Sequence, residues 1–178
     1  MESFAIIAEF NPFHMGHARL IRQVRQAAGP EAAIVIIMSG AFVQRGEPAF
    51  FDKWHRASWA IDGGADVVIE LPAVYALSSA AGFAQGGVTL AARLGCQALA
   101  CGVEGGTAAD FLSLARRAEG LTACLKAAKK ASAGQQLTDA LMAAAPDEAR
   151  LLQQPNALLA CEYARAMLKQ EQPLAFLP

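Results

Sequence analysis

The sequence has 178 residues, of which 54% are hydrophobic, and a formal net charge of −1 at pH 7. This length suits one domain, and the composition excludes an intrinsically disordered chain, which would combine low hydrophobicity with high net charge. No apolar run reaches the roughly 18–20 residues that a membrane-spanning helix needs, so we expect no membrane partner. The near-neutral charge disfavours a self-sufficient RNA-binding domain, whose surface is normally strongly basic.

The opening residues and the cysteines favour a cytoplasmic protein. The first ten residues, MESFAIIAEF, contain a short apolar run without a basic flank, which is typical of a first β-strand rather than a signal peptide. The four cysteines form no CxxC pair and no zinc-finger spacing, so we interpret them as reduced, mostly buried thiols. They are Cys96, Cys101, Cys124 and Cys161.

Short apolar runs alternate with helical patterns through the first hundred residues. We expect strands at residues 4–8, 33–38, 67–71 and 97–101, the second and third of them buried. We expect helices at residues 16–28, 52–62 and 78–94. In the helix 52–62, Trp54, Ala57 and Ile61 share one side. Alternating strands and helices imply right-handed crossovers and a parallel sheet, so the sequence predicts a Rossmann-like α/β fold.

The second half of the chain has a different, helical pattern. We expect helices at residues 108–119, 121–131, 135–145 and 156–169, with glycine and proline between them. Residues 173–177 read as the start of a fifth strand. We therefore expect one domain over residues 1–178, with a βαβ core at 1–106 and a helical segment at 107–172.

The segment EFNPFHMGH, residues 9–17, leaves the first strand and enters the first helix. In an open parallel sheet, ligands bind outside the carboxyl ends of the strands. Pro12 restrains Asn11 to an extended backbone, and Gly16 allows close approach to the main chain. His14 and His17 lie one turn apart, where the free N–H groups of a helix start also favour phosphate. This pattern favours phosphoryl chemistry, in which imidazoles donate hydrogen bonds to phosphate oxygens.

Two other interpretations of the histidine pair stay open. A metal site would need a third ligand, and His55 is the only other histidine in the sequence. The segment could also be a structural loop, although polar clusters on stiff loops are usually functional. We expect no metal ligand set in the protein.

Three stretches of the sequence resemble a known family. They are IIAEFNPFHMGH, then SGAFVQRGEPAFFDKWHRASWAIDGGADVVIELP, then QPNALLACEYARAM. The HxGH element resembles the signature of the HIGH nucleotidyltransferase superfamily, and the wider match resembles the tRNA(Met) cytidine acetate ligases. The resemblance implies a HIGH-type Rossmann fold and a ligase that uses ATP, with Mg²⁺, to convert acetate into acetyl-adenylate. The acetyl group then passes to N4 of the wobble cytidine of elongator tRNA(Met), without a DNA partner.

The resemblance also implies site residues. His14 and His17 would be catalytic, contacting the phosphates and stabilising the transition state. Arg45, Lys53 and Arg56 are further candidates for phosphate or substrate contacts, although Lys53 and Arg56 could equally form a solvated helix face. The residues implied to bind ATP are Ile7, Ala8, Glu9, Phe10, Asn11, Pro12, Phe13, His14, Met15, Gly16, His17, Leu20, Gly102 and Asn156.

The sequence departs from the family in two respects. Ala41 stands where the family usually carries asparagine. The family's later Arg-Gly element and its Ser-x-x-x-Arg signature are not in the sequence, so we expect the family's carboxyl-terminal part to lie outside it. Two alternatives therefore remain, namely an HxGH adenylyltransferase acting on a small cofactor precursor, and a non-catalytic module that binds nucleotide or tRNA.

Overall fold

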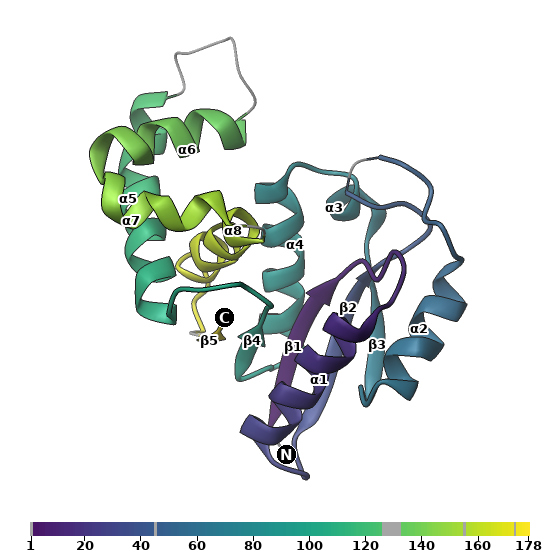
Figure 1. The fold of residues 1–178 in the computed structure, drawn as a ribbon. Coiled ribbons are helices and arrows are strands. Elements are labelled where there is room, and N and C mark those ends of the chain that lie inside the picture. The colour runs from purple at the N-terminus through teal and green to yellow at the C-terminus, as the bar shows by residue number, and fades with distance from the viewer. Residues whose placement is uncertain (1, 45, 126–132, 155, 173) are drawn as a thin grey trace.

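Five parallel strands form one sheet in the order β3-β2-β1-β4-β5 (Figure 1). The computed structural model describes residues 2–44, 46–125, 133–154, 156–172 and 174–178. The strands are β1 (Ser3–Ala8), β2 (Ala33–Ser39), β3 (Val67–Leu71), β4 (Ala98–Ala100) and β5 (Ala175–Leu177). The predicted α/β fold with a parallel sheet is confirmed, including the strand near the end of the sequence.

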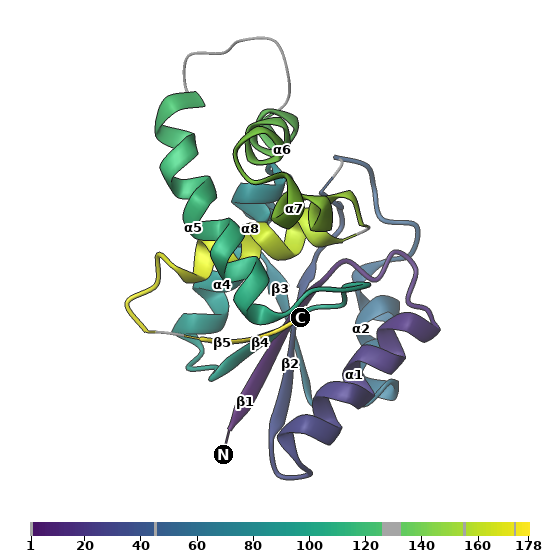
Figure 2. The same cartoon turned by 60° about the vertical axis from the view of Figure 1, so that its left-hand side comes forward.

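Helices cover both faces of the sheet. They are α1 (Met15–Ala28), α2 (Lys53–Asp62), α3 (Ala73–Ala76), α4 (Ala80–Arg93), α5 (Ala108–Leu125), α6 (Ala133–Ala144), α7 (Pro146–Ala149) and α8 (Ala157–Met167), with a 3₁₀-helix at Arg150–Gln153. Figure 2 shows α1 and α2 side by side on one face, while α4 and α8 lie on the other and α5 packs on α8. None of the helices in the described ranges is long and apolar enough to cross a membrane.

The sheet separates two hydrophobic cores, because successive side chains of a strand point to opposite faces. On β1, Ile7 belongs to the larger core beneath α4, α5 and α8, whereas Ile6 belongs to the smaller core beneath α1 and α2. The burial of β2 on both faces is confirmed, since β2 lies between β1 and β3. The predicted burial of β3 is wrong for Val67 and Glu70, which are exposed because β3 is an edge strand.

One prediction about the helices is also wrong. The helix α5 runs without interruption through Gly120, where two helices were predicted. In α2 the buried residues are Arg56 and Ala60, whereas Trp54 is 74% exposed and Ile61 44% exposed. The inward face is thus set by Arg56, which no amphipathic pattern would place inside. Residues 126–132, which include the end of the predicted helix 121–131, lie outside the described residues.

Three cysteines are free and buried, as predicted for structural thiols, namely Cys96, Cys101 and Cys161. Burial raises the pKa of Cys101 and of Cys161 to about 12, so both remain protonated thiols at neutral pH. No side-chain position is described for Cys124.

Candidate active site

The carboxyl ends of β1 and β4 mark the switch point of the sheet. The chain builds β1, β2 and β3 in one direction and then returns to place β4 on the other side of β1. In open α/β sheets the ligand crevice lies at such a point. The loop after β1 holds residues 9–14 and leads into α1, and the loop after β4 leads into α5. The motif at residues 9–17 and Gly102 therefore follow the two strands that meet at this switch point.

His14 and His17 stack against each other at the first turn of α1. Their ring centroids are 3.6 Å apart and the ring planes are inclined by 21°, which confirms that they share one face of the turn. Nδ1 of His14 accepts a hydrogen bond from the N–H of Gly16 at 3.1 Å. Nδ1 of His17 accepts one from the N–H of His14 at 3.2 Å. The two imidazoles thus form a capping box at the helix start.

This capping corrects one detail of the sequence analysis. The N–H of Gly16 is bonded to the His14 ring, and the N–H of His17 donates to the His14 carbonyl at 2.9 Å. These two N–H groups are therefore not free for phosphate. Because each ring accepts a hydrogen bond at Nδ1, its neutral tautomer carries the proton on Nε2. Each ring consequently offers an Nε2–H donor on the side away from its backbone contact.

His17 is a neutral imidazole at physiological pH. Burial, and secondarily the neighbouring His14, lower the pKa of His17 to about 4. The Phe10 ring meets the His17 ring edge-on at a centroid distance of 4.8 Å, and the Phe13 ring lies 5.6 Å away. Phe10 is 2% exposed and has a φ of +50°, a conformation that residues with a Cβ rarely adopt. Its packing therefore holds the loop in an unfavourable backbone geometry beside His17.

Side chains of the β1 loop bind the loop that follows β2. Oε1 of Glu9 accepts a hydrogen bond from the N–H of Gln44 at 2.6 Å, and Oδ1 of Asn11 accepts one from the N–H of Phe50 at 2.6 Å. The Asn11–Pro12 peptide bond is cis. Glu9 and Asn11, both implied ATP contacts, therefore each hold a neighbouring loop through a carboxylate or amide oxygen.

Arg56 of α2 also connects the loop after β1 with the loop after β2. Its side chain has no exposed surface. Its guanidinium donates to the carbonyls of Glu9 at 2.6 Å, Ser39 at 3.1 Å and Phe51 at 2.9 Å, and also to the carbonyl of Gly40. The prediction of a phosphate contact or a solvated helix face is therefore wrong for Arg56. Its role is to satisfy backbone carbonyls where the site loops leave the sheet.

The other two basic candidates have different placements. Nζ of Lys53 forms an ion pair with Glu70 at 2.6 Å and lies 5.2 Å from the centroid of the Trp54 ring. Glu70 packs against Gly40, where an added Cβ would lie 2.0 Å from the Glu70 carboxylate. Lys53 is thus engaged with a carboxylate at the edge of the sheet. Arg45 lies outside the described residues.

Gly102 follows β4, and Asn156 lies at the start of α8. An added Cβ at Gly102 would meet only Cδ2 of Leu20, at 3.9 Å, so the backbone there is open and close to α1. Asn156, with a φ of +63°, precedes α8, and its Nδ2 donates to Oε1 of Glu104 at 3.3 Å. The structure therefore brings Leu20 and Gly102 together, and Asn156 next to the β4 loop. Glu104 was not predicted as a site residue, although its position two residues after Gly102 was an available signal.

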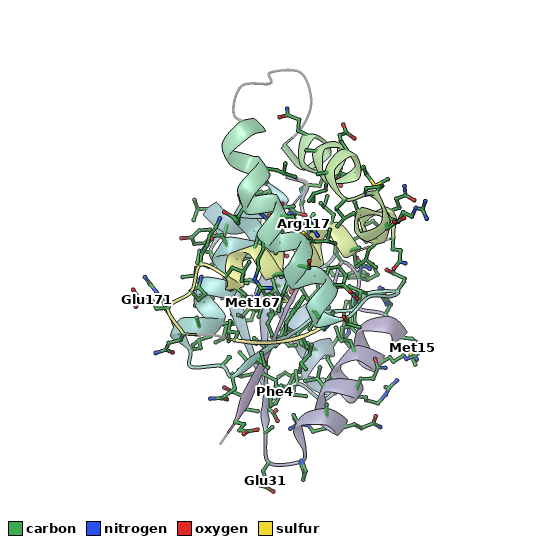
Figure 3. All side chains as sticks on the ribbon, turned by 90° about the vertical axis from the view of Figure 1, so that its left-hand side faces the viewer. Phe4, Met15, Glu31, Arg117, Met167 and Glu171 are labelled. Carbon is green, nitrogen blue, oxygen red and sulfur yellow. The ribbon has the colours of Figure 1, made fainter. Side chains whose placement is uncertain are left out.

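The remaining residues of the motif differ in what they can offer a ligand. Ile7 and Phe10 are 7% and 2% exposed, so only their backbone atoms are within reach. Ala8 is half-buried and Pro12 is exposed. Met15 is 75% exposed and projects outward from the start of α1 (Figure 3).

His55 stands apart from the histidine pair. Its Nδ1 lies 2.5 Å from the carboxylate of Asp52, which also accepts hydrogen bonds from the N–H groups of Trp54 and His55. This arrangement caps the start of α2. Within the described ranges, no three His, Cys, Asp or Glu side chains gather where they could hold a metal ion.

Sequence reasoning missed three buried polar atoms. Ser39 Oγ, Gln44 Nε2 and Tyr163 Oη have no hydrogen-bond partner among the described residues. Burial above all, and then Cys101 and Glu9, raise the pKa of Tyr163 well above its ordinary value. No pattern in the sequence marks these atoms, because their burial depends on loops and helices that are distant along the chain.

A parallel sheet in the order 3-2-1-4-5, with a stacked histidine pair at the loop after its first strand, defines a Rossmann-like protein of the nucleotidyltransferase class. The model of the family described as HIGH Nucleotidyl Transferase matches residues 1–178. The chain therefore belongs to the HIGH nucleotidyl transferase family.

Relatives within this class share a narrower name. The chain is 37% identical over 186 residues to a tRNA(Met) cytidine acetate ligase of Leuconostoc mesenteroides, covering 100% of this chain and 45% of the relative. It is 52% identical over 104 residues to a protein of the same name from Pediococcus pentosaceus, covering 58% of this chain and 28% of that relative. Thermotoga maritima TmcAL bound with alpha-thio ATP is similar at a TM-score of 0.87 and 33% identity, covering 99% of this chain and 46% of that chain. The chain thus spans less than half the length of these relatives.

Proposed function

We propose that this chain provides the ATP site of an acetate ligase that forms acetyl-adenylate and acetylates N4 of the wobble cytidine of elongator tRNA(Met). The observation that carries the proposal is the stacked pair of His14 and His17 at the switch point of the sheet. Similarity to a Thermotoga maritima structure bound with an ATP analogue supports ATP as the ligand. The names of the relatives support acetate and tRNA(Met) as the other substrates.

In this proposal ATP lies between the β1 loop and the β4 loop, with its phosphates at the start of α1. The Nε2–H groups of His14 and His17 donate hydrogen bonds to phosphate oxygens. Gly102 leaves room for the nucleoside because its nearest neighbour across the crevice, Leu20, is 3.9 Å from where a Cβ would be. Asn156 contacts the nucleotide from the start of α8. Arg56 positions the β1 loop through the Glu9 carbonyl.

The proposed activation step joins acetate to the α-phosphate. A carboxylate oxygen of acetate attacks the α-phosphorus, and the bond to the bridging oxygen breaks, so that pyrophosphate leaves. Negative charge builds on the phosphate oxygens, where preorganised donors stabilise it. His17 suits this role because it is neutral above its pKa of about 4 and donates without first taking up a proton. In the transfer step the N4 amine attacks the acetyl carbon, AMP leaves, and N4 loses a proton.

Mg²⁺ belongs to the proposal as a companion of ATP. The ion commonly rests on phosphate oxygens and water with few protein ligands, and it neutralises phosphate charge. The Nε2–H groups of His14 and His17 would donate to the phosphates that the ion accompanies.

The test is exchange of labelled pyrophosphate into ATP by this chain, with and without acetate. We expect exchange that requires acetate and is lost in His14→Ala and His17→Ala variants that keep the parent's circular dichroism spectrum. Exchange that requires a phosphorylated cofactor precursor instead would favour the other adenylyltransferase. ATP binding without exchange under any condition would favour the non-catalytic module and contradict catalysis by this chain.

A further inference from the structure

A groove of about 780 Å³ is lined by residues of α1, of α2 and of the loops beside them, including Phe13 of the loop after β1. Both ribbon views show these two helices side by side (Figures 1 and 2). Its lining residues are Pro12, Phe13, Ala18, Arg22, Phe51, Trp59, Asp62, Gly63 and Gly64. The volume falls in the range of small-molecule sites, about 300–1,000 Å³.

The lining of the groove combines aromatic rings with two adjacent glycines, Gly63 and Gly64. The rings of Phe51 and Trp59 meet edge-on at a centroid distance of 5.0 Å, so the face of one ring is bordered by the edge of the other. A Cβ at Gly63 would lie 2.8 Å from Cζ of Phe13, so the Phe13 ring sits directly on the main chain of Gly63. Such a site favours a flat ring, which stacks on aromatic side chains.

The groove also presents one guanidinium and one carboxylate. Arg22 and Asp62 are both exposed, and neither has a hydrogen bond or ion pair with any other described residue. By contrast, Arg25 on the same helix is paired, because its guanidinium donates to the carboxylate of Asp66 at 2.5 Å. Arg22 is thus available to donate and Asp62 to accept, which is the pairing that a nucleobase edge requires.

The positive charge of α1 favours a polyanionic ligand. The helix carries arginine at 19, 22 and 25 and no acidic residue, although the whole chain has a net charge of −1. Arg19 is exposed and lies one turn before Arg22, so the two share a helix face. A phosphate that follows a base in the groove would meet this face.

We propose that the groove binds one unstacked base of single-stranded RNA, with the ring against Phe51 and Trp59. Arg22 donates to the carbonyl or ring nitrogen of the base, and Asp62 accepts from its amino group. This inference rests on the proposed function, which supplies an RNA substrate. The Phe13 ring lines the groove, and its centroid lies 5.6 Å from the centroid of the His17 ring. A base held in the groove therefore lies next to the loop that carries the histidine pair.

Trp59 reports directly on the groove. The sequence has two tryptophans, so a Trp54→Phe background leaves Trp59 as the sole reporter. The probe is a hairpin RNA whose loop contains unpaired cytidines, and the control ligand is a blunt duplex of equal length. We expect the hairpin to quench Trp59 fluorescence, and Arg22→Gln to weaken that binding by about tenfold, because one base contact is lost. Arg93→Gln, which removes an exposed arginine at the end of α4, should leave it unchanged.

The outcomes separate the inference from the proposed function. ATP binding is measured on the same proteins by calorimetry and should be unchanged by Arg22→Gln. Retained ATP binding with no quenching by the hairpin, or with equal quenching by the duplex, overturns the RNA groove alone. A folded parent that binds neither ATP nor the hairpin overturns the proposed function as well. Quenching that rises with protein concentration in the absence of RNA would show that a second copy fills the groove, which also overturns the inference.

Discussion

Arg56→Met is expected to lower the free energy of unfolding by about 3–5 kcal/mol, because it removes the donor of four backbone carbonyls. The Arg56 side chain has no exposed surface and donates to the carbonyls of Glu9, Ser39, Gly40 and Phe51. The bonds to Ser39 and Gly40 are buried, and those to Glu9 and Phe51 are part-buried. A buried carbonyl left without a donor costs about 1–3 kcal/mol, while release of a desolvated charge offsets part of that sum. Domains of this size have a total stability of about 5–15 kcal/mol, so the variant loses a large share.

Urea unfolding followed by circular dichroism measures this change. Arg56→Lys keeps the charge, but its single nitrogen has three donors for four carbonyls, so we expect an intermediate loss. Arg93→Met is the matched control, since Arg93 is exposed at the end of α4 and its replacement should change stability by less than about 0.5 kcal/mol. A stability of Arg56→Met within about 1 kcal/mol of the parent, at an unchanged denaturant slope, would refute this account of Arg56.

The stability of the parent should fall between pH 6.5 and 4, where the unfolded chain binds a proton on His17 and the folded chain, with a pKa of about 4, does not. His17→Gln should flatten that fall in urea unfolding at pH 7 and pH 5, and an equally steep fall would contradict burial of a neutral ring. A Cβ at Gly86 would lie 2.2 Å from Cγ of Tyr75, so Gly86→Ala should destabilise by about 1–3 kcal/mol despite better helix propensity. A Cβ at Gly120 would have no atom within 4 Å, so Gly120→Ala should instead stabilise the fold by up to about 1 kcal/mol in thermal unfolding. Equal changes in stability for Gly86→Ala and Gly120→Ala would contradict a clash between residue 86 and Tyr75. Tyr163→Phe removes a buried hydroxyl without a partner among the described residues, so its stability should stay equal or rise by about 1 kcal/mol, whereas a clear loss would reveal a partner.

The strands and their parallel arrangement could be predicted because apolar runs and their alternation with helices are local properties of the sequence. The range 67–71 is the observed β3, yet its place at the edge of the sheet depends on strand order and was not predictable from an apolar run alone. Gly120 read as a helix break, but a helix absorbs one glycine at a cost of about 1 kcal/mol. Arg56 read as a surface residue because its four acceptors come from loops that are distant in the sequence.

The candidate site was partly predictable for a similar reason. The spacing of His14 and His17 places two rings on one face of a helical turn, and the rings do stack. The spacing does not say that Nδ1 of each ring caps the helix and leaves Nε2 as the donor, because that depends on side-chain rotamers. The groove beside Trp59 depends on how α1 and α2 pack, which no local pattern encodes.

Calorimetric titration of ATP with Mg²⁺ into this chain tests most directly the proposal that the loops after β1 and β4 form a nucleotide site. We expect the parent to bind, and His17→Ala and Gly102→Val to lose about tenfold or more in affinity while keeping the parent's circular dichroism spectrum. His17→Ala removes an Nε2–H donor, and Gly102→Val places a branched side chain where the backbone is open toward Leu20. A folded parent that shows no binding at millimolar ATP, or folded variants that bind as tightly as the parent, would contradict the claim.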